Sequence, residues 1–313
     1  MKLKRIGLFG ASGYAGCELI KILARHGGVE LVAPNTPDFE GLDGKPIREL
    51  DPEYTGSLTF TAYSVDRIND LGLDLVLLAT PDPVSEKVVP QLKVPKIVDL
   101  SRAYRASPDW TYGLTEYHRD AVRTCRWLSN PGCYPTACQL ATLPLVRAGL
   151  VDRIVFNCLS GFSGAGRAPL YVNDPKNYTD NVIPYKITRH AHEAEIRRQL
   201  GLNASFTPHV VPFFRGILAT AHVFLKKSVA PEQIRTMFVE RYANEPFVKV
   251  LDRHPEIRDA RKTNFCCIGG FEVDDVNRAV IVSTIDNLVK GAAGQAVQNM
   301  NLMLGFPETQ GLL

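Results

Sequence analysis

The sequence GASGYAG at residues 10–16 decides the fold of the first part of this chain. It follows a short apolar run at Arg5–Phe9 and leads into Gly13–Arg25, whose apolar residues have helical spacing. Small residues at a strand-to-helix turn let the backbone approach a pyrophosphate, which the free N–H groups and positive dipole end of the helix then bind. Since GxxGxxG is a variant of the dinucleotide fingerprint in its required context, we expect a dinucleotide to bind at Gly10, Ser12, Gly13, Tyr14, Ala15 and Gly16. A glycine-rich turn without a ligand is the alternative.

The end of the second expected strand, Glu30–Ala33, bears on the choice between NAD and NADP. An acidic residue there would hold the ribose 2′-hydroxyl of NAD, but the strand runs into VAPNT without one. Asn35 and Thr36 can hydrogen-bond a 2′-phosphate, and the nearest cations downstream are Lys45 and Arg48. The missing acid favours NADP or NADPH as the cofactor.

The order of apolar runs and helical segments along the chain predicts two different sheets. In the first third, short apolar runs alternate with helical segments, which favours a parallel sheet covered on both faces; the further strands expected there are 75–79, 96–100 and 126–129. The second half has longer β-branched and aromatic runs joined by short turns, which predicts a mixed or antiparallel sheet with helices on one side. Its expected strands are 154–160, 206–211, 216–225, 265–273 and 279–286, and its clearest helices are 191–200 and 231–243, before a last helix at 292–304.

Length and composition exclude several classes of protein. The 313 residues are enough for about two domains. The net charge of +3, from 36 basic and 33 acidic side chains, is small for a nucleic-acid binder, which usually shows a larger or more clustered excess. No uncharged apolar run approaches the roughly 20 residues of a membrane helix, and the start of the chain lacks the pattern of a signal peptide. We therefore expect a cytoplasmic protein with reduced thiols and neither nucleic acid nor membrane as a partner.

The sequence NPGCYPT at residues 130–136 contains the most informative of the seven cysteines. Cys133 lies between strand-like residues 126–129 and helix-like residues 136–148, in the turn before a helix. The N–H groups and dipole of a helix N-terminus stabilise a thiolate, and the same groups can hold an oxyanion. Five cysteines fall within expected helices or strands, where a small buried hydrophobic role is the ordinary one: Cys17, Cys138, Cys158, Cys266 and Cys267. No CxxC pair suggests zinc.

A thiol that passes on a proton needs a base, and the segment RHAHEAE supplies two histidines. His190 and His192 precede a predicted helix, and Glu195 lies three residues beyond His192, where a carboxylate can orient an imidazole or position a substrate. Two histidines can also be metal ligands, but no third ligand at a suitable spacing joins them, and we expect no metal. Of the other histidines, we expect a surface position for His26, His118 and His254, a satisfied core position for His222 and a possible site position for His209.

A nicotinamide site together with an activated cysteine points to reversible reduction of an acyl group to an aldehyde through a thioester. The chain resembles the N-acetyl-γ-glutamyl-phosphate reductases, relatives of the aspartate-semialdehyde dehydrogenases, over nearly its whole length. The segments that carry the resemblance are GASGYAG at 10–16, DLS at 99–101, NPGCYPT at 130–136, SGFSGAGR at 160–167, HAHEAEI at 190–196, FTPH at 206–209, RGIL at 215–218 and TIDNLVKGAAGQAVQNMN at 284–301.

The resemblance implies a fold and a set of roles. It implies an α/β chain with a Rossmann-like NAD(P)-binding domain, residues 1–132 plus 292–313, and an α+β domain, residues 133–291, that carries catalysis and forms a homodimer or homotetramer. Cys133 would be the nucleophile, and His192 or His190 the acid–base group. Ser163, Gly164 and Asn287 would lie at the nicotinamide end of NADPH, with Lys290-Gly291 closing that region. The residues implied to bind the acyl phosphate are Arg105, Asn130, Ser160, Glu195, His209 and Arg215.

Two alternatives stay open at this point. The same chemistry can act on a carrier-linked aminoadipyl phosphate or on β-aspartyl phosphate in place of the N-acetylglutamyl phosphate of arginine biosynthesis, because the stretch between the DLS segment and Cys133 is short, as in a compact subgroup. The other alternative is a nucleotide-sensing regulator that kept the fold and lost catalysis. Cys133, the histidine pair and Asn287, present together, argue against that reading.

Overall fold

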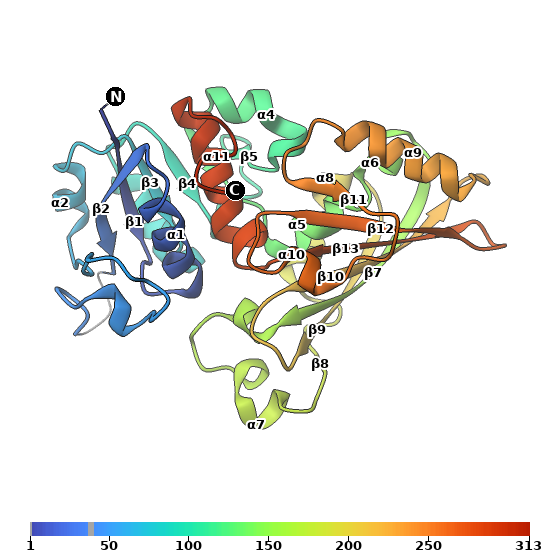
Figure 1. Cartoon of the computed structure of the whole chain (residues 1–313), viewed down its shortest axis with the longest axis horizontal. Helices are drawn as coiled ribbons and strands as arrows, with labels where there is room; N and C mark the ends of the chain where they lie inside the picture. The colour runs from blue at the N-terminus through green and yellow to red at the C-terminus, as the bar shows by residue number, and fades with distance from the viewer. Residues whose placement is uncertain (1, 37–40) are drawn as a thin grey trace. The chain divides into compact units, whose positions relative to one another are not determined.

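The computed structural model describes residues 2–36 and 41–313 and divides into two compact units, each with its own sheet (Figure 1). Unit 1 comprises Met1–Gly132 and Ala292–Leu313, and unit 2 comprises Cys133–Gly291. The predicted fold class, a parallel Rossmann-like sheet plus an α+β domain with a mixed sheet, is confirmed. Within the described residues, no helix combines the length and the apolar character needed to cross a bilayer.

Unit 1 is built on a six-stranded sheet in which every neighbouring pair is parallel. In sheet order the strands are β2 (Val29–Asn35), β1 (Lys4–Phe9), β3 (Leu75–Leu78), β4 (Ile97–Asp99), β6 (Trp127–Ser129) and β5 (Thr111–Tyr112). The wholly apolar run that forms β3 is buried along its entire length, as a central strand covered on both faces requires. The helices are α1 (Tyr14–Ala24), α2 (Val65–Asn69), α3 (Asp82–Val88), α4 (Thr115–Thr124) and α11 (Gly294–Leu304), with short turns η1 (Ile47–Glu49) and η2 (Val89–Gln91).

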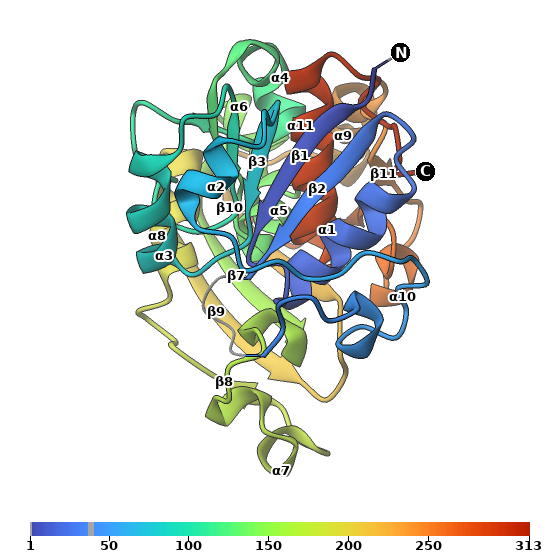
Figure 2. The same ribbon diagram turned by 90° about the vertical axis from the view of Figure 1, so that its left-hand side faces the viewer.

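Helices cover both faces of this parallel sheet. On one face, Ile68 of α2 and Val88 of α3 join Phe9, Val76 and Leu78 of the strands in one apolar cluster. Helix α1 packs on β2 and on α11, so the last helix of the chain belongs to the other face. Figure 2 shows α2 and α3 on one side of β1 and β3, and α1 with α11 on the other. Parallel α/β sheets bind ligands at the carboxyl ends of their strands, and the turn at residues 10–16 follows the carboxyl end of β1.

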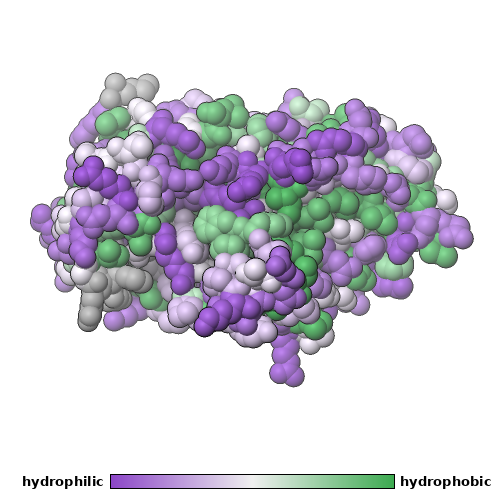
Figure 3. All heavy atoms as spheres, turned by 60° about the horizontal axis from the view of Figure 1, so that its bottom comes forward, coloured by the Kyte–Doolittle hydropathy of each residue, from purple (hydrophilic) through white to green (hydrophobic). Residues whose placement is uncertain are grey.

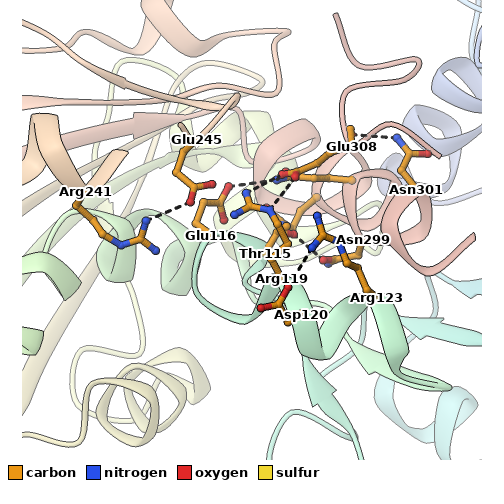
Figure 4. Close-up of polar contacts among 12 residues, drawn as sticks. Thr115, Glu116, Arg119, Asp120, Arg123, Arg241, Glu245, Asn299, Asn301 and Glu308 are labelled. Carbon is orange, nitrogen blue, oxygen red and sulfur yellow. Dashed lines mark hydrogen bonds and ion pairs between the residues drawn. The ribbon is translucent and has the colours of Figure 1, made fainter. Parts of the chain in front are cut away.

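A buried polar layer fixes α11 to α4 (Figure 4). Thr115 donates a hydrogen bond to Asn299 at 2.7 Å, and Arg119 donates two N–H groups to the carboxylate of Glu308, at 2.9 and 3.2 Å. The Asn299 amide also donates to the side-chain oxygen of Asn130 at 3.1 Å. The C-terminal helix therefore holds the loop that leads into Cys133.

His26 corrects one expectation, because it is only 3% exposed and not a surface residue. Its Nδ1 accepts the N–H of Gly28 at 3.2 Å, its Nε2 hydrogen-bonds Asn301 at 2.7 Å, and the ring of Phe306 packs edge-on against it at 5.1 Å. Most of this cover comes from the far end of the chain. The polar neighbours of His26 in the sequence gave no sign of it.

The burial of His26 predicts a pH-dependent stability. Burial lowers the pKa of His26 below its ordinary value of 6.5, so the unfolded chain binds more protons than the folded one below that pH. The stabilising contribution is complete above about pH 6.5 and is lost as the pH falls from there through the lower folded pKa. We expect the free energy of unfolding, measured by denaturant titration between pH 7.5 and 5.5, to fall more steeply for the wild type than for His26→Gln. Equal slopes would contradict this.

Unit 2 is built on a seven-stranded mixed sheet. In sheet order the strands are β11 (Val248–Val250), β12 (Cys266–Val273), β13 (Arg278–Ile285), β10 (Ile217–Leu225), β7 (Val151–Gly161), β9 (Ala204–Val211) and β8 (Ile183–Pro184). In β10, alternate residues from Ile217 to Leu225 are buried, and those between them are partly exposed. His222 is one of the partly exposed residues, so its expected core position is wrong.

The helices of unit 2 are α5 (Cys133–Leu140), α6 (Leu143–Arg147), α7 (Pro175–Tyr178), α8 (Ala191–Leu200), α9 (Pro231–Tyr242) and α10 (Ile257–Ala260), with short turns η3 (Phe162–Ala165) and η4 (Tyr171–Asn173) and a π-helical turn η5 (Val289–Ala293). Helices α5, α8 and α9 pack against strands of the sheet, whereas α7 packs against the short turn η4. Helix α5 lies against β10, β13 and α8. Ser283 of β13 donates a hydrogen bond to the Ala137 carbonyl of α5 at 3.0 Å.

The region after Cys133 differs from the single helix predicted over residues 136–148. The helix begins at Cys133 itself and ends at Leu140, and α6 follows after a break. Pro135 is tolerated because the N–H groups of the first helical turn have no partner within the helix. Pro144 lacks an N–H and its ring excludes the carbonyl four residues earlier, so the helix cannot continue through it.

Candidate functional site

The turn at residues 10–16 connects β1 to α1 in unit 1, and its three glycines have different requirements. Gly10 has a φ of +79°, and a side chain there would collide with the Ala79 carbonyl. A side chain at Gly16 would collide with the Gly10 carbonyl. Gly13 has an extended backbone (φ −70°, ψ 163°), and a Cβ there would come no closer than 3.5 Å to Gly10. The fold therefore needs Gly10 and Gly16, whereas only a close ligand needs Gly13.

Gly13→Ala is accordingly expected to weaken NADPH binding without unfolding the chain. The loss of one close backbone contact with a pyrophosphate corresponds to an increase in Kd of about tenfold or more. Titration followed by NADPH fluorescence measures the Kd, and the melting temperature serves as the control. Gly16→Ala should instead lower the melting temperature, since its Cβ meets backbone. Unchanged NADPH affinity in Gly13→Ala would show that the turn does not hold the cofactor.

Asn35 and Thr36, at the end of β2, have distinct positions. The Asn35 side chain is fully buried, accepts from Thr61 and from the Tyr63 N–H, and donates to the Tyr63 carbonyl. Its backbone carbonyl accepts the N–H groups of Gly10 and Ala11. The Thr36 hydroxyl, by contrast, is buried with no hydrogen-bond partner among the residues that the structure describes. Of the two, Thr36 has the polar atom still available to a cofactor.

Cys133 is the first residue of α5 and is half-buried. At this position the thiol lies beside N–H groups that have no partner within the helix. The other cysteines lack such a setting. Cys17, Cys138, Cys158, Cys266 and Cys267 are all buried, as predicted. Burial raises the pKa of Cys138 well above its ordinary value and that of Cys267 to about 11, which keeps both as thiols.

The histidine pair lies at the start of α8, at the same end of α5 as Cys133. The ring of Tyr134, the residue after Cys133, packs edge-on against His190 at 5.9 Å and against His192 at 5.8 Å. The centroids of the two imidazole rings lie 4.7 Å apart. Glu195 is buried on the same helix, one turn after His192.

His190 and His192 differ in what their rings can do. His190 is the N-cap of α8, and its Nδ1 accepts the backbone N–H of His192 at 3.1 Å. An Nδ1 that accepts a hydrogen bond carries no proton, so the neutral His190 ring has its proton on Nε2. Accepting a second proton would break the cap. His192 has no capping role and is therefore better suited to proton transfer.

Two tyrosines beside the histidines were not anticipated from the sequence. Tyr134 is buried, Tyr185 donates its hydroxyl to that of Tyr134 at 3.4 Å, and Tyr185 also packs against His190. Burial raises the pKa of both phenols, well above the ordinary value for Tyr134. Both stay protonated at neutral pH, so they order the histidines and do not act as bases. The only feature of the sequence that could have pointed to these tyrosines is that Tyr134 directly follows Cys133.

A second cluster in unit 2 joins the expected nicotinamide-side residues. Asn287 donates its amide N–H to the Ser163 hydroxyl at 2.9 Å and accepts the N–H of Gly216 at 2.7 Å. A Cβ on Gly164 would lie 2.9 Å from the Ser160 hydroxyl. The structure thus brings together Ser160, Ser163, Gly164 and Asn287, four of the predicted positions.

The remaining predicted substrate residues are placed as follows. In unit 1, Arg105 donates to the carbonyls of Leu100 and Asn130, both at 2.8 Å, and the Asn130 amide bonds the Ala292 carbonyl as well as Asn299. These bonds give Asn130 a structural task, and its contact with a substrate stays a prediction. In unit 2, the His209 carbonyl accepts from Tyr134, and Arg215 is 4% exposed beside Asp286.

Two family descriptions match this chain. Residues 5–125 match "Semialdehyde dehydrogenase, NAD binding domain", and residues 133–287 match "Semialdehyde dehydrogenase, dimerisation domain". The relative named N-acetyl-gamma-glutamyl-phosphate reductase from Methanobrevibacter smithii is 40% identical and aligns with 98% of this chain and 97% of its own. A relative of the same name from Xanthomonas campestris pv. campestris is 41% identical over 97% of this chain and 96% of its own.

Solved structures share the fold. Aspartate semialdehyde dehydrogenase II from Vibrio cholerae, in complex with ASA, has a TM-score of 0.79 and 18% identity, covering 97% of this chain and 99% of that one. Aspartate semialdehyde dehydrogenase with NADP from Candida albicans has a TM-score of 0.74 and 16% identity, with the same coverage. The resemblance inferred from the motifs is confirmed.

Proposed function

Since the chain belongs to the semialdehyde dehydrogenase family, we propose that it reduces N-acetyl-γ-glutamyl phosphate to N-acetylglutamate 5-semialdehyde and phosphate with NADPH, a step of arginine biosynthesis. The observation that carries the reaction type is Cys133 at the first position of α5, beside the Tyr134 ring that packs against the histidine pair. Identity of about 40% along nearly the whole chain with reductases of that name supports the substrate.

The chemistry begins with the thiol. Cys133 passes its proton to His192, and the thiolate attacks the acyl carbon. The N–H groups at the start of α5 stabilise the tetrahedral oxyanion. The C–S bond forms, the C–O bond to phosphate breaks, and inorganic phosphate leaves a thioester on Cys133.

The second half of the reaction returns the thiolate. When bound, NADPH would supply the hydride that reduces the thioester carbonyl. His192 gives its proton to the oxygen that gains charge, and takes it back as the C–S bond breaks to release the semialdehyde. The N-cap bond occupies Nδ1 of His190, so this imidazole orders the site beside His192.

The cofactor fits the residues of unit 1. The turn Gly10–Gly16 would hold the pyrophosphate, and the space at Gly13 is the feature that the fold itself does not need. The buried Thr36 hydroxyl, at the end of a strand without an acidic residue, supports NADP over NAD. Ser163, Gly164 and Asn287 would lie against the nicotinamide.

A panel of semialdehydes tests both substrate and cofactor. Phosphate-dependent reduction of NADP or NAD is followed with N-acetylglutamate 5-semialdehyde, aspartate semialdehyde and a carrier-linked aminoadipate semialdehyde. We expect the N-acetylglutamate compound with NADP to have the highest kcat/KM. A higher kcat/KM with another semialdehyde would replace the substrate but keep the reaction, and cofactor binding without any turnover would favour a regulator.

We also propose that unit 2 forms a homodimer through the partly exposed side of its sheet, and that the enzyme works in the cytoplasm, where its thiol stays reduced. The dimerisation-domain match spans this sheet. Leu218 and Phe224 of β10 lie on that side with Leu159 and Val282 of the neighbouring strands, and Figure 3 shows a band of apolar side chains over unit 2. Sedimentation should give twice the 34.6 kDa of one chain, or four times for a tetramer. A monomer would contradict the proposal.

A further inference from the structure

Asp286, at the end of β13, has a fully buried carboxylate for which the reaction has no direct use. Its Oδ1 accepts the N–H groups of Leu288 at 2.8 Å and of Val289 at 3.2 Å. Its Oδ2 accepts the N–H of Lys262 at 2.7 Å and lies 3.6 Å from the Arg215 guanidinium. A buried charge is costly unless it is paired and hydrogen-bonded, and these four contacts supply that compensation.

The two contacts of Oδ1 organise the turn that lies against Cys133. Leu288 and Val289 lead into the π-helical turn η5, where the N–H of Gly291 donates to the Asp286 backbone carbonyl at 2.8 Å. A Cβ added to Gly291 would lie 2.7 Å from the Cys133 Cβ and 3.2 Å from its Cα. π-Helical turns are rare and frequently occur at functional sites. The turn that Asp286 holds therefore packs directly against Cys133, the proposed nucleophile.

The other oxygen organises the loop before β10. The Arg215 side chain is 4% exposed and its guanidinium faces Asp286. The next residue, Gly216, donates its N–H to Asn287. The adjacent pair Asp286-Asn287 thus fixes both the guanidinium and the backbone of this loop.

We propose that Asp286 is a positioning residue for the reaction: Oδ1 fixes the turn behind Cys133, and Oδ2 fixes the guanidinium of Arg215 for the anionic substrate. The role of Arg215 rests on the proposed function. The placement of Cys133 rests on the fold alone, so the two parts can fail separately.

Asp286→Asn tests the part that concerns Arg215. An amide keeps an oxygen for Leu288 and Val289 but removes the negative charge that faces Arg215. We expect the KM of the anion that Arg215 holds, phosphate or semialdehyde, to rise about tenfold or more, while the rate at which iodoacetamide alkylates Cys133 stays within about twofold. Arg215→Lys should raise the same KM, and the double variant should add little to either single change. Independent, additive increases, or an unchanged KM in Asp286→Asn, would overturn this part.

Gly291→Ala tests the part that concerns Cys133. Its methyl group would displace the nucleophile, and a misplacement of about 1 Å costs about 100-fold in rate. We expect kcat and the alkylation rate of Cys133 to fall together, with NADPH affinity and KM nearly unchanged. Unchanged kcat and alkylation in a folded Gly291→Ala variant would overturn this part.

The control is Asp274→Asn, which removes a carboxylate from a partly exposed ion pair with Arg278 in the same unit. It should change neither KM nor alkylation. If the wild type does not act on N-acetylglutamate 5-semialdehyde, the proposed function fails, whereas the alkylation rates still decide how Cys133 is placed.

Discussion

Cys133→Ser is expected to lose turnover by about 10⁴-fold or more, because removing an enzyme's nucleophile usually costs that much. A serine hydroxyl at the start of α5 is not ionised near neutral pH, so it neither attacks the acyl phosphate nor forms the thioester. The substitution changes one atom of a half-buried side chain. NADPH binding, measured by fluorescence titration, should therefore stay at the wild-type level while kcat collapses.

Two further measurements make the Cys133 result specific. In the wild type, mixing enzyme with acyl phosphate in the absence of NADPH should release one phosphate per active site, and the variant should release none. Cys125→Ser is the matched control, since Cys125 is also only partly buried but lies after α4 in unit 1. It should retain nearly full activity. Near-wild-type turnover in Cys133→Ser would refute the thioester mechanism.

The local sequence pattern was sufficient to predict a helix or strand where that element is regular and long. The β-branched and aromatic run of β10 and the continuous apolar run of β3 were sufficient signals. Helix α8 was predicted with its observed bounds, and in the structure it ends at Gly201, which has a left-handed conformation. Strands of two or three residues, such as β5 and β8, are too short to show any period. They exist only because a neighbouring strand pairs with them.

The site was predictable as far as a residue's role depends on its local segment. Cys133 and the histidine pair could be predicted because each lies directly before a segment with a helical pattern. Asn35 does not, because the groups that satisfy its amide, Thr61 and Tyr63, lie more than 25 positions away. The same holds for Asp286 beside the π-helical turn, because the groups that face its Oδ2, the N–H of Lys262 and the guanidinium of Arg215, lie far away in the sequence. Distant partners decided each position that the sequence left open.

His192→Asn is expected to lower kcat by about 10² to 10⁴-fold, the usual contribution of a positioned acid–base group, whereas His190→Asn should retain most of the turnover. The reason is the different task of each ring. His190 accepts the His192 N–H as the N-cap of α8, and asparagine is an equally good N-cap, so that variant preserves the helix start. Asparagine at position 192 has no group that titrates near neutral pH. Initial rates measured from pH 5.5 to 9 should lose one ionisation in His192→Asn and keep both limbs in His190→Asn. A larger loss in His190→Asn would transfer the acid–base role to that residue, and small, equal losses would exclude the pair from proton transfer.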